Sequence, residues 1–153
     1  MSARAAARLE TLGFRRVYRY QPGKADWFAA GLPREGTEAG TARVADLAER
    51  DVSTCRVGER LDVVRDRLRE SGSDVCVVVD DQRVVLGLVE GVSADSPPDT
   101  RVESVMRSNP ITFRPNVRAG QLPEYLKTPA TRLALVSSSD GVLIGVLRDP
   151  GHQ

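Results

Sequence analysis

The sequence predicts a mixed α/β protein of the α+β class, in which two copies of a β-α-β-β repeat pack by pseudo-two-fold symmetry. Short β-branched apolar runs alternate with polar turns, and an amphipathic helix precedes one pair of runs. The two similar segments share a single offset of 58 positions: Val44 and Val102, Thr54 and Thr112, and Gly87 and Gly145. A fixed offset indicates a duplicated unit, and each unit is too small to bury a core alone.

Each copy begins with a short helical lead-in and an extended segment. In the lead-ins, residues 44–48 and 102–106, the apolar side chains recur three or four positions apart. Extended segments are expected around 53–57 and 111–113.

A helix should follow in each copy. In the first copy Leu61, Val64 and Leu68 form one apolar face, and Gly72 is placed to end the helix. In the second copy Gly120 and Pro123 disfavour a helix across 118–127. We therefore expect that helix to begin near Leu122, with Pro123 in its first turn.

Each copy ends in two apolar strands joined by a polar turn. The expected strands are 75–79 and 84–89 in the first copy, and 133–136 and 142–147 in the second. Their unbroken apolar character implies burial on both faces. Residues 90–101 contain two prolines and two serines and read as the connector, and 35–41 form an earlier connector.

The composition argues against several classes of partner. Lys and Arg total 22 and Asp and Glu total 21, so the net charge of +1 favours neither nucleic acid nor an anionic membrane. No apolar stretch approaches the roughly 20 residues of a membrane helix, and the N-terminus lacks the apolar run of a secretory signal. We expect a cytoplasmic protein, with Cys55 and Cys76 as buried thiols rather than metal ligands.

Catalytic signatures are absent from the sequence. It contains no GxxxxGK[ST] or GxGxxG loop to hold a phosphate. The single histidine, His152, lies beside the C-terminus, where a general base is hard to orient. The acidic pair Asp80 and Asp81 falls in an expected turn. We therefore expect a protein that is not an enzyme.

The β-α-β-β repeat, with its lead-in helix and its apolar-Gly-apolar last strand, resembles the CBS domain. The resemblance covers about 42–149, which gives a first repeat at 42–91 and a second repeat at 102–149. Tandem CBS domains form a two-fold sandwich called a Bateman module. The resemblance implies a regulatory or sensor module that binds AMP, ATP or S-adenosylmethionine in clefts between its copies.

The resemblance also implies which residues would line those clefts. They come from the start of each early strand, from each middle strand and from the end of each last strand. The implied residues are Val52, Ser53, Thr54, Cys76, Val77, Glu90, Pro110, Ile111, Thr112, Ala134, Leu135 and Arg148.

The chain departs from the family at the ends of the last strands. Binders in the family often carry Gly-apolar-apolar-Thr/Ser-x-x-Asp, whose hydroxyl and carboxylate hold the ribose. Here Glu90 and Ser93 follow Gly87, and Arg148 and Gly151 follow Gly145. Glu90 could still accept a ribose hydroxyl and Arg148 could bind a phosphate. The alternatives are solvated side chains and a cleft that is empty or differently occupied.

Residues 1–36 resemble the closing third of a rhodanese-like domain. The resemblance rests on a helix leading through a LxxxGF turn into an expected strand at 17–20, and then on a helix with Trp27 that ends in Gly-Leu-Pro at 31–33. The family's nucleophilic cysteine would precede this segment, so we expect no sulfur transfer from this chain alone. The segment is either a relic or the end of a domain whose start lies upstream.

The sequence thus predicts a regulatory CBS pair that forms a homodimer through its repeat helices and passes ligand occupancy to a regulated partner protein. Two alternatives stay open. One is an interaction or dimerisation module without a small ligand, and the other is a truncated sulfurtransferase-associated protein.

Overall fold

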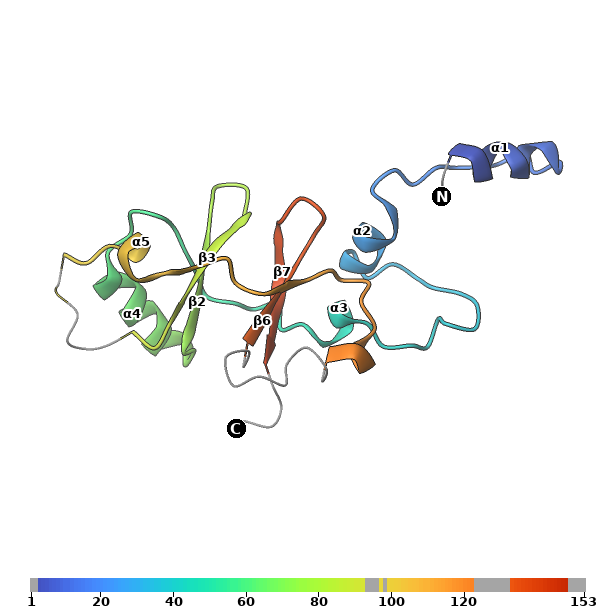
Figure 1. Ribbon diagram of the computed structural model, residues 1–153. Helices are drawn as coiled ribbons and strands as arrows, with labels where there is room; N and C mark the ends of the chain where they lie inside the picture. Colours follow the sequence, from blue (N-terminus) through green and yellow to red (C-terminus); the bar gives the residue numbers. More distant parts are fainter. Residues whose placement is uncertain (1–2, 93–96, 98, 123–132, 149–153) are drawn as a thin grey trace.

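The computed structural model describes residues 3–92, 97, 99–122 and 133–148, and the elements follow the order expected of two repeats (Figure 1). The elements are α1 (Ala3–Thr11), α2 (Gly23–Ala29), α3 (Val44–Leu47), β1 (Thr54–Cys55), α4 (Leu61–Ser71), β2 (Val75–Val79), β3 (Val85–Glu90), α5 (Val102–Val105), β4 (Arg107–Ser108), β5 (Thr112–Phe113), the 3-10 helix η1 (Ala119–Gln121), β6 (Leu133–Ser137) and β7 (Leu143–Arg148).

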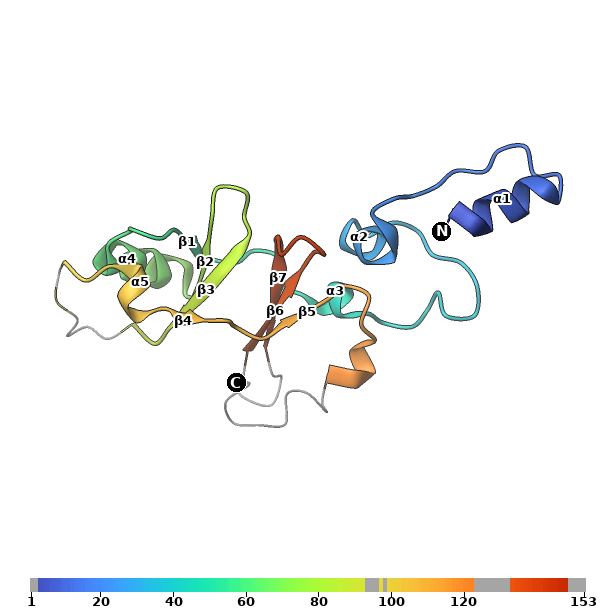
Figure 2. The same cartoon turned by 45° about the horizontal axis from the view of Figure 1, so that its top comes forward.

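Two small mixed sheets carry the fold. One has the strand order β1-β2-β3-β4 and the other the order β5-β6-β7. In each sheet the early strand runs parallel to the middle strand, and the middle and last strands form an antiparallel hairpin. The hairpins lie next to each other at the centre of the molecule (Figure 2). The predicted α/β class and strand positions are confirmed.

The strand pairing obeys the sequence repeat residue by residue. Thr54 pairs with Val77 in one sheet, and their counterparts Thr112 and Leu135 pair in the other. The hairpin irregularity after Val78 recurs 58 positions later, after Val136. The same register in both sheets is what pseudo-two-fold symmetry requires.

The symmetry axis passes between two valines. Val84 and Val142 are counterparts in the repeat, and they form an antiparallel bridge with each other. On either side of this bridge the amide of Val85 donates to Gly141 O at 3.0 Å, and the amide of Leu143 donates to Arg83 O at 2.9 Å. These hydrogen bonds join the two hairpins edge to edge at their turns.

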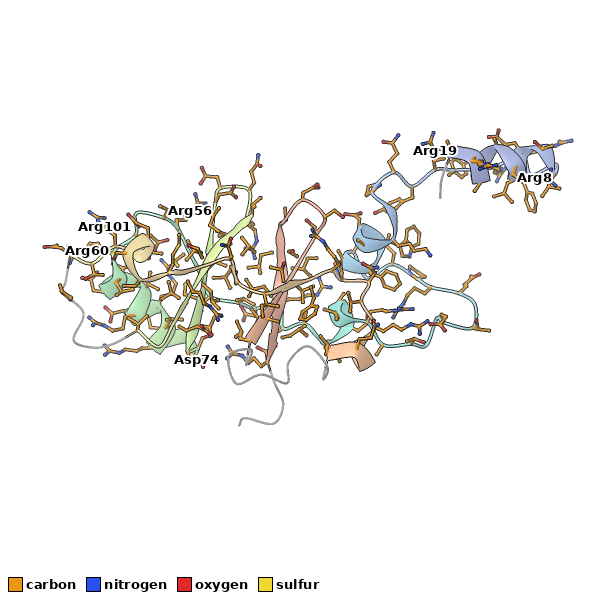
Figure 3. The ribbon with its side chains drawn as sticks, viewed as in Figure 1. Arg8, Arg19, Arg56, Arg60, Asp74 and Arg101 are labelled. Carbon is orange, nitrogen blue, oxygen red and sulfur yellow. The ribbon has the colours of Figure 1, made fainter. Side chains whose placement is uncertain are left out.

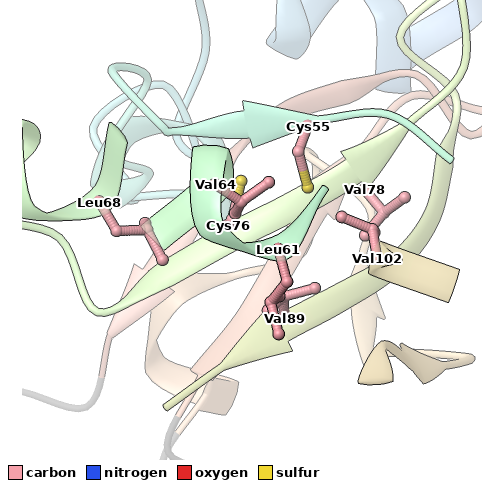
Figure 4. Close-up of a cluster of buried hydrophobic side chains, with 8 residues drawn as sticks. All are labelled: Cys55, Leu61, Val64, Leu68, Cys76, Val78, Val89 and Val102. Atoms are coloured by element: carbon pink, nitrogen blue, oxygen red, sulfur yellow. The ribbon is translucent and has the colours of Figure 1, made fainter. Parts of the chain in front are cut away.

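The lead-in helices cross over between the repeats. Val44 of α3 is fully buried against Phe113, Ala134, Val136 and Leu147 of the second repeat. Val102 of α5 is fully buried in the core of the first repeat, with Cys55, Leu61, Val64 and Val89 (Figure 4). The backbone contacts repeat as well, because Val44 N donates to Val117 O at 2.9 Å and Val102 N donates to Glu59 O at 3.1 Å. Each repeat is therefore completed by the lead-in of the other.

A third cluster joins the two sheets. Its buried members come from the faces of both hairpins that point toward each other: Val75, Val77, Val79, Leu88, Leu133, Leu135, Leu143 and Val146. The alternate residues of the same strands, such as Cys76 and Val78, enter the outer cores. Burial on both faces explains why the strands are continuously apolar.

Helix α4 follows its sequence pattern. Leu61, Val64 and Leu68 are buried, and the helix ends at Gly72, which has the left-handed φ of 64°. That conformation favours glycine at a helix end. In the second repeat η1 occupies residues 119–121 and leads to the buried Leu122. The rest of the helix expected from Leu122 and Pro123 lies outside the described residues.

The N-terminal segment departs from one expectation. Residues 17–20 were predicted to form a strand, but they are irregular in the structure. The physical reason is that no other described segment offers them backbone hydrogen bonds. Helix α2 carries Trp27 as expected, and α1 projects away from the repeats (Figures 1 and 2). Leu12, Phe14 and Tyr18 remain 59, 60 and 80% exposed.

Candidate ligand-binding site

Ion pairs occupy the ends of the two last strands, where ligand contacts were predicted from the sequence. Glu90, at the end of β3, pairs with Arg107 at 3.1 Å. Arg148, at the end of β7, pairs with Glu49 at 3.2 Å. Glu49 and Arg107 are counterparts in the repeat, as are Glu90 and Arg148. Both copies therefore have an ion pair at this position, and the acidic residue of each pair corresponds to the basic residue of the other.

Arg148 makes further contacts with the first repeat. Its Nη1 lies 2.6 Å from Asp74 Oδ1, and its Nη2 donates to Ser73 Oγ at 3.4 Å. The guanidinium of Arg148 lowers the pKa of Asp74 below its ordinary value of 3.8. Figure 3 places Asp74 at the end of the central hairpins. One arginine thus joins the last strand of the second repeat to the start of β2 in the first.

The contribution of the Asp74–Arg148 pair to stability should depend on pH. Because folding lowers the pKa of Asp74, its contribution to stability is present above pH 3.8 and is lost as the pH falls further. Asp74→Asn should lower the free energy of unfolding by less than about 1 kcal/mol near neutral pH, since Asp74 is 76% exposed. Urea unfolding at several pH values should show the difference between wild type and variant shrinking as the pH falls below 3.8. A difference that is constant with pH would contradict the pair.

The early strands present a partly accessible edge. Val52, Ser53 and Thr54 are half-buried, and Ser53 Oγ lies 3.0 Å from Ser71 Oγ of α4. In the second repeat Pro110 is half-buried, whereas Ile111 and Thr112 are exposed. Main-chain atoms here are already engaged, since Ser53 O accepts from Val77 N and Ile111 O accepts from Leu135 N, both at 2.9 Å.

The middle-strand residues lie deeper than a ligand contact requires. The side chains of Cys76, Val77, Ala134 and Leu135 are all 0% exposed. A ligand would reach them only after the side chains that cover them had moved. Their assignment to a ligand site stays a prediction.

The two cysteines face the same core. Cys55 and Cys76 are free thiols in the cluster beneath α4 (Figure 4). A hydrogen bond with Cys76 and burial raise the pKa of Cys55 far above its ordinary value. Such a thiol is a poor nucleophile near neutral pH. Among the described residues no group of His, Cys, Asp and Glu is placed to hold a metal ion.

A cavity of about 340 Å³ lies directly beside Asp74. Its lining residues come from α4, from the turn after it and from the segment that follows Glu90: Arg65, Leu68, Arg69, Gly72, Ser73, Asp74, Gly91 and Val92. This volume is near the lower end of the range for small-molecule sites. All of these residues come from the first-repeat side, and the cavity lies next to the strand end that carries Glu90.

Sequence reasoning missed Glu49, Asp74 and Arg107. One signal was available, because Glu49 and Arg107 share the 58-residue offset with opposite charges, as Glu90 and Arg148 do. Two repeat positions that exchange charge together indicate a paired contact. Asp74 carries the same signal, because the residue 58 positions later in the sequence is Arg132, whose charge is opposite.

No family model and no curated protein matches the chain. Solved structures do match it. An acetoin utilization protein (AcuB) from Vibrio cholerae is 19% identical, with a TM-score of 0.62 over 71% of this chain and 85% of that one. The CBS domain pair of protein MJ0100, in complex with 5-methylthioadenosine and S-adenosyl-L-methionine, is 14% identical, with a TM-score of 0.62 over 71% and 90%. CBSX2 in complex with AMP is 19% identical, with a TM-score of 0.60 over 69% and 89%.

Proposed function

We propose that this chain, which has the fold of a CBS-domain pair, is a non-catalytic regulatory module that binds an adenine nucleotide or a related adenosine compound where its two repeats meet. The observation that carries the proposal is the exchanged ion-pair arrangement. Each last strand is tied to the segment that follows the opposite lead-in, through Glu90–Arg107 and Arg148–Glu49. A ligand that competes for either pair would alter how the repeats contact each other.

The ligand class comes from fold neighbours and from the chemistry of the site. Two of the similar structures hold adenosine compounds, S-adenosylmethionine and AMP. In this chain the carboxylate of Glu90 is an acceptor suited to ribose hydroxyls, and the guanidinium of Arg148 suits a phosphate. The cavity beside Asp74 supplies adjacent space.

The ion pairs are weak enough to act as a switch. Arg148 is 38% exposed and Arg107 is 44% exposed, and exposed pairs contribute only about 0–1 kcal/mol each. A phosphate could therefore displace Asp74 or Glu49 from Arg148 at low cost. The freed contacts would change the junction of the repeats, and a regulated partner protein would sense that change.

The second candidate is an interaction or dimerisation module without a small ligand. The same ion pairs favour it, because Glu90 and Arg148, the two charged residues expected to bind a ligand, already pair with other residues of the chain. The exposed side chain of Val63 on α4, which is 49% exposed, fits the proposal of a homodimer through the repeat helices. No described helix is long and apolar enough to cross a membrane. A cytoplasmic location remains part of the proposal.

Thermal melting with AMP, ATP, NADH and S-adenosylmethionine at millimolar concentration tests the proposal. At a concentration of ten times the Kd, a ligand should raise the melting temperature by roughly 3–6 °C. Glu90→Gln should reduce that shift, whereas the control Glu70→Gln, on the exposed face of α4, should leave it unchanged. No shift with any of the four compounds would favour the interaction module.

A further inference from the structure

The N-terminal segment docks on the second repeat through a clamped aromatic ring. The guanidinium carbons of Arg34 and Arg43 lie 5.2 and 5.3 Å from the ring centroid of Phe28 in α2. Arg43 immediately precedes α3, and its Nη1 donates to the carbonyl of Asn116 at 3.4 Å. The contact therefore joins α2, the first lead-in and the second repeat.

A cavity of about 580 Å³ lies at this junction. Its walls combine cations, two carboxylates and flat or apolar side chains. The lining includes Lys24, Trp27, Phe28, Glu38, Arg43 and Arg118. Two contacts hold Trp27 in place. Its Nε1 donates to Pro33 O at 2.9 Å, and its ring packs edge-on against the ring of Tyr20, with the two ring centroids 5.2 Å apart.

Hydrogen-bond donors exceed acceptors on the charged wall. One of the two carboxylates, that of Glu38, serves both Arg118, at 2.8 Å, and Arg43, at 3.5 Å. The other belongs to Glu35. The Nε of Arg43 is buried and has no hydrogen-bond partner among the described residues. No ion pair links Lys24 to the described part of the chain. The lining holds four cationic side chains against the two carboxylates of Glu35 and Glu38, so it keeps an excess of positive charge and of hydrogen-bond donors for an anion.

The opposite end of the molecule provides a natural comparison. Arg101 and Arg60, both labelled in Figure 3, are the counterparts of Arg43 and Arg118. Arg101 Nη1 donates to Gly58 O at 2.6 Å. At that end Arg60 has two carboxylates of its own, Asp62 at 2.6 Å and Asp99 at 3.6 Å. Helix α2, which carries Trp27 and Phe28, lies at the second-repeat end (Figure 1).

We propose that this cavity is a second ligand site and that it binds a small organic phosphate. The phosphate lies against Arg118, Arg43 and Lys24, because guanidinium groups bind phosphate oxygens through charge-assisted hydrogen bonds. The organic part lies against Trp27, whose indole suits contact with a flat ring. The site is separate from the one beside Glu90 and Asp74 and does not depend on it.

The single tryptophan makes the test specific. Trp27 is the only tryptophan in the chain, so its fluorescence reports on this cavity alone. Phenyl phosphate, titrated into the full chain at constant ionic strength, should change the fluorescence saturably, and inorganic phosphate should bind roughly tenfold more weakly for lack of a ring. Arg118→Ala should weaken phenyl phosphate binding roughly tenfold.

The matched control is Arg60→Ala, which removes the counterpart arginine at a similar exposure, 43% against 54% for Arg118. It should leave the titration unchanged. Lys24→Gln, at an exposed position, is a second variant that should weaken binding severalfold without touching an ion pair. Absence of a saturable change at millimolar phenyl phosphate would overturn the proposal. Equal losses in Arg118→Ala and Arg60→Ala would also overturn it, because they would indicate general charge attraction.

Discussion

Gly145→Ala should lower the free energy of unfolding by about 3 kcal/mol. A Cβ at this position would lie 2.4 Å from the carbonyl oxygen of Glu49 and 3.1 Å from Cβ of Ala48. Both atoms belong to the segment that follows α3 and crosses onto β7, where Glu49 and Val146 form a bridge. Because the nearest atom is backbone, the clash can be relieved only if the crossing segment moves away from the sheet.

Alanine substitutions at two other glycines should have smaller effects on stability and serve as comparisons. Gly87 is the counterpart in the first repeat, but its added Cβ would meet the flexible Met106 side chain at 2.9 Å and Arg107 O at 3.1 Å, so Gly87→Ala should cost about 1 kcal/mol. Gly40→Ala, in open space, should change stability by less than about 0.5 kcal/mol. Urea unfolding measures all three. A Gly145→Ala protein as stable as wild type would mean that the lead-in does not cross onto β7.

Val102→Asp should destabilise the protein by about 4 kcal/mol or more. Val102 is 0% exposed and lies among Cys55, Leu61 and Val89 of the first repeat, although it belongs to the second repeat in sequence. A carboxylate there would lose its water with no compensating cation. This substitution tests whether the second lead-in packs into the first repeat. Gly145→Ala tests whether the first lead-in packs onto the second repeat.

Val105→Asp is the control on the same short helix. Val105 is 45% exposed, so the same substitution should cost less than about 1 kcal/mol. If Val102→Asp does not fold, Val102→Ala keeps the comparison measurable, with an expected loss of about 2 kcal/mol in urea unfolding. Equal effects at positions 102 and 105 would show that α5 does not insert Val102 into the first repeat's core.

The repeat made the fold predictable, because strand position, pairing and symmetry all follow from one offset. The exchange of lead-ins did not follow, although Val44 and Val102 were recognised as apolar positions. Apolar spacing identifies the side chains that must be buried, but it does not say which of two similar cores receives them. The predicted strand at 17–20 failed for a related reason, since a strand needs a partner that local sequence cannot supply.

The candidate site was predictable only in part. The strand ends that carry Glu90 and Arg148 follow from their distance to Gly87 and Gly145 in the sequence. Their partners come from segments brought near by the crossing of the lead-ins, and Asp74 reaches Arg148 across 74 positions of sequence. The depth of the middle-strand side chains depends on how the hairpins pack. No sequence period reports that depth.

Isothermal titration calorimetry of the full chain with AMP measures the proposed regulatory binding most directly. Saturable heat with a defined stoichiometry, weakened in Glu90→Gln and retained in Glu70→Gln, is the expected result. Absence of heat at millimolar AMP, and equally with ATP, NADH and S-adenosylmethionine, would contradict adenosine-compound sensing by this repeat pair.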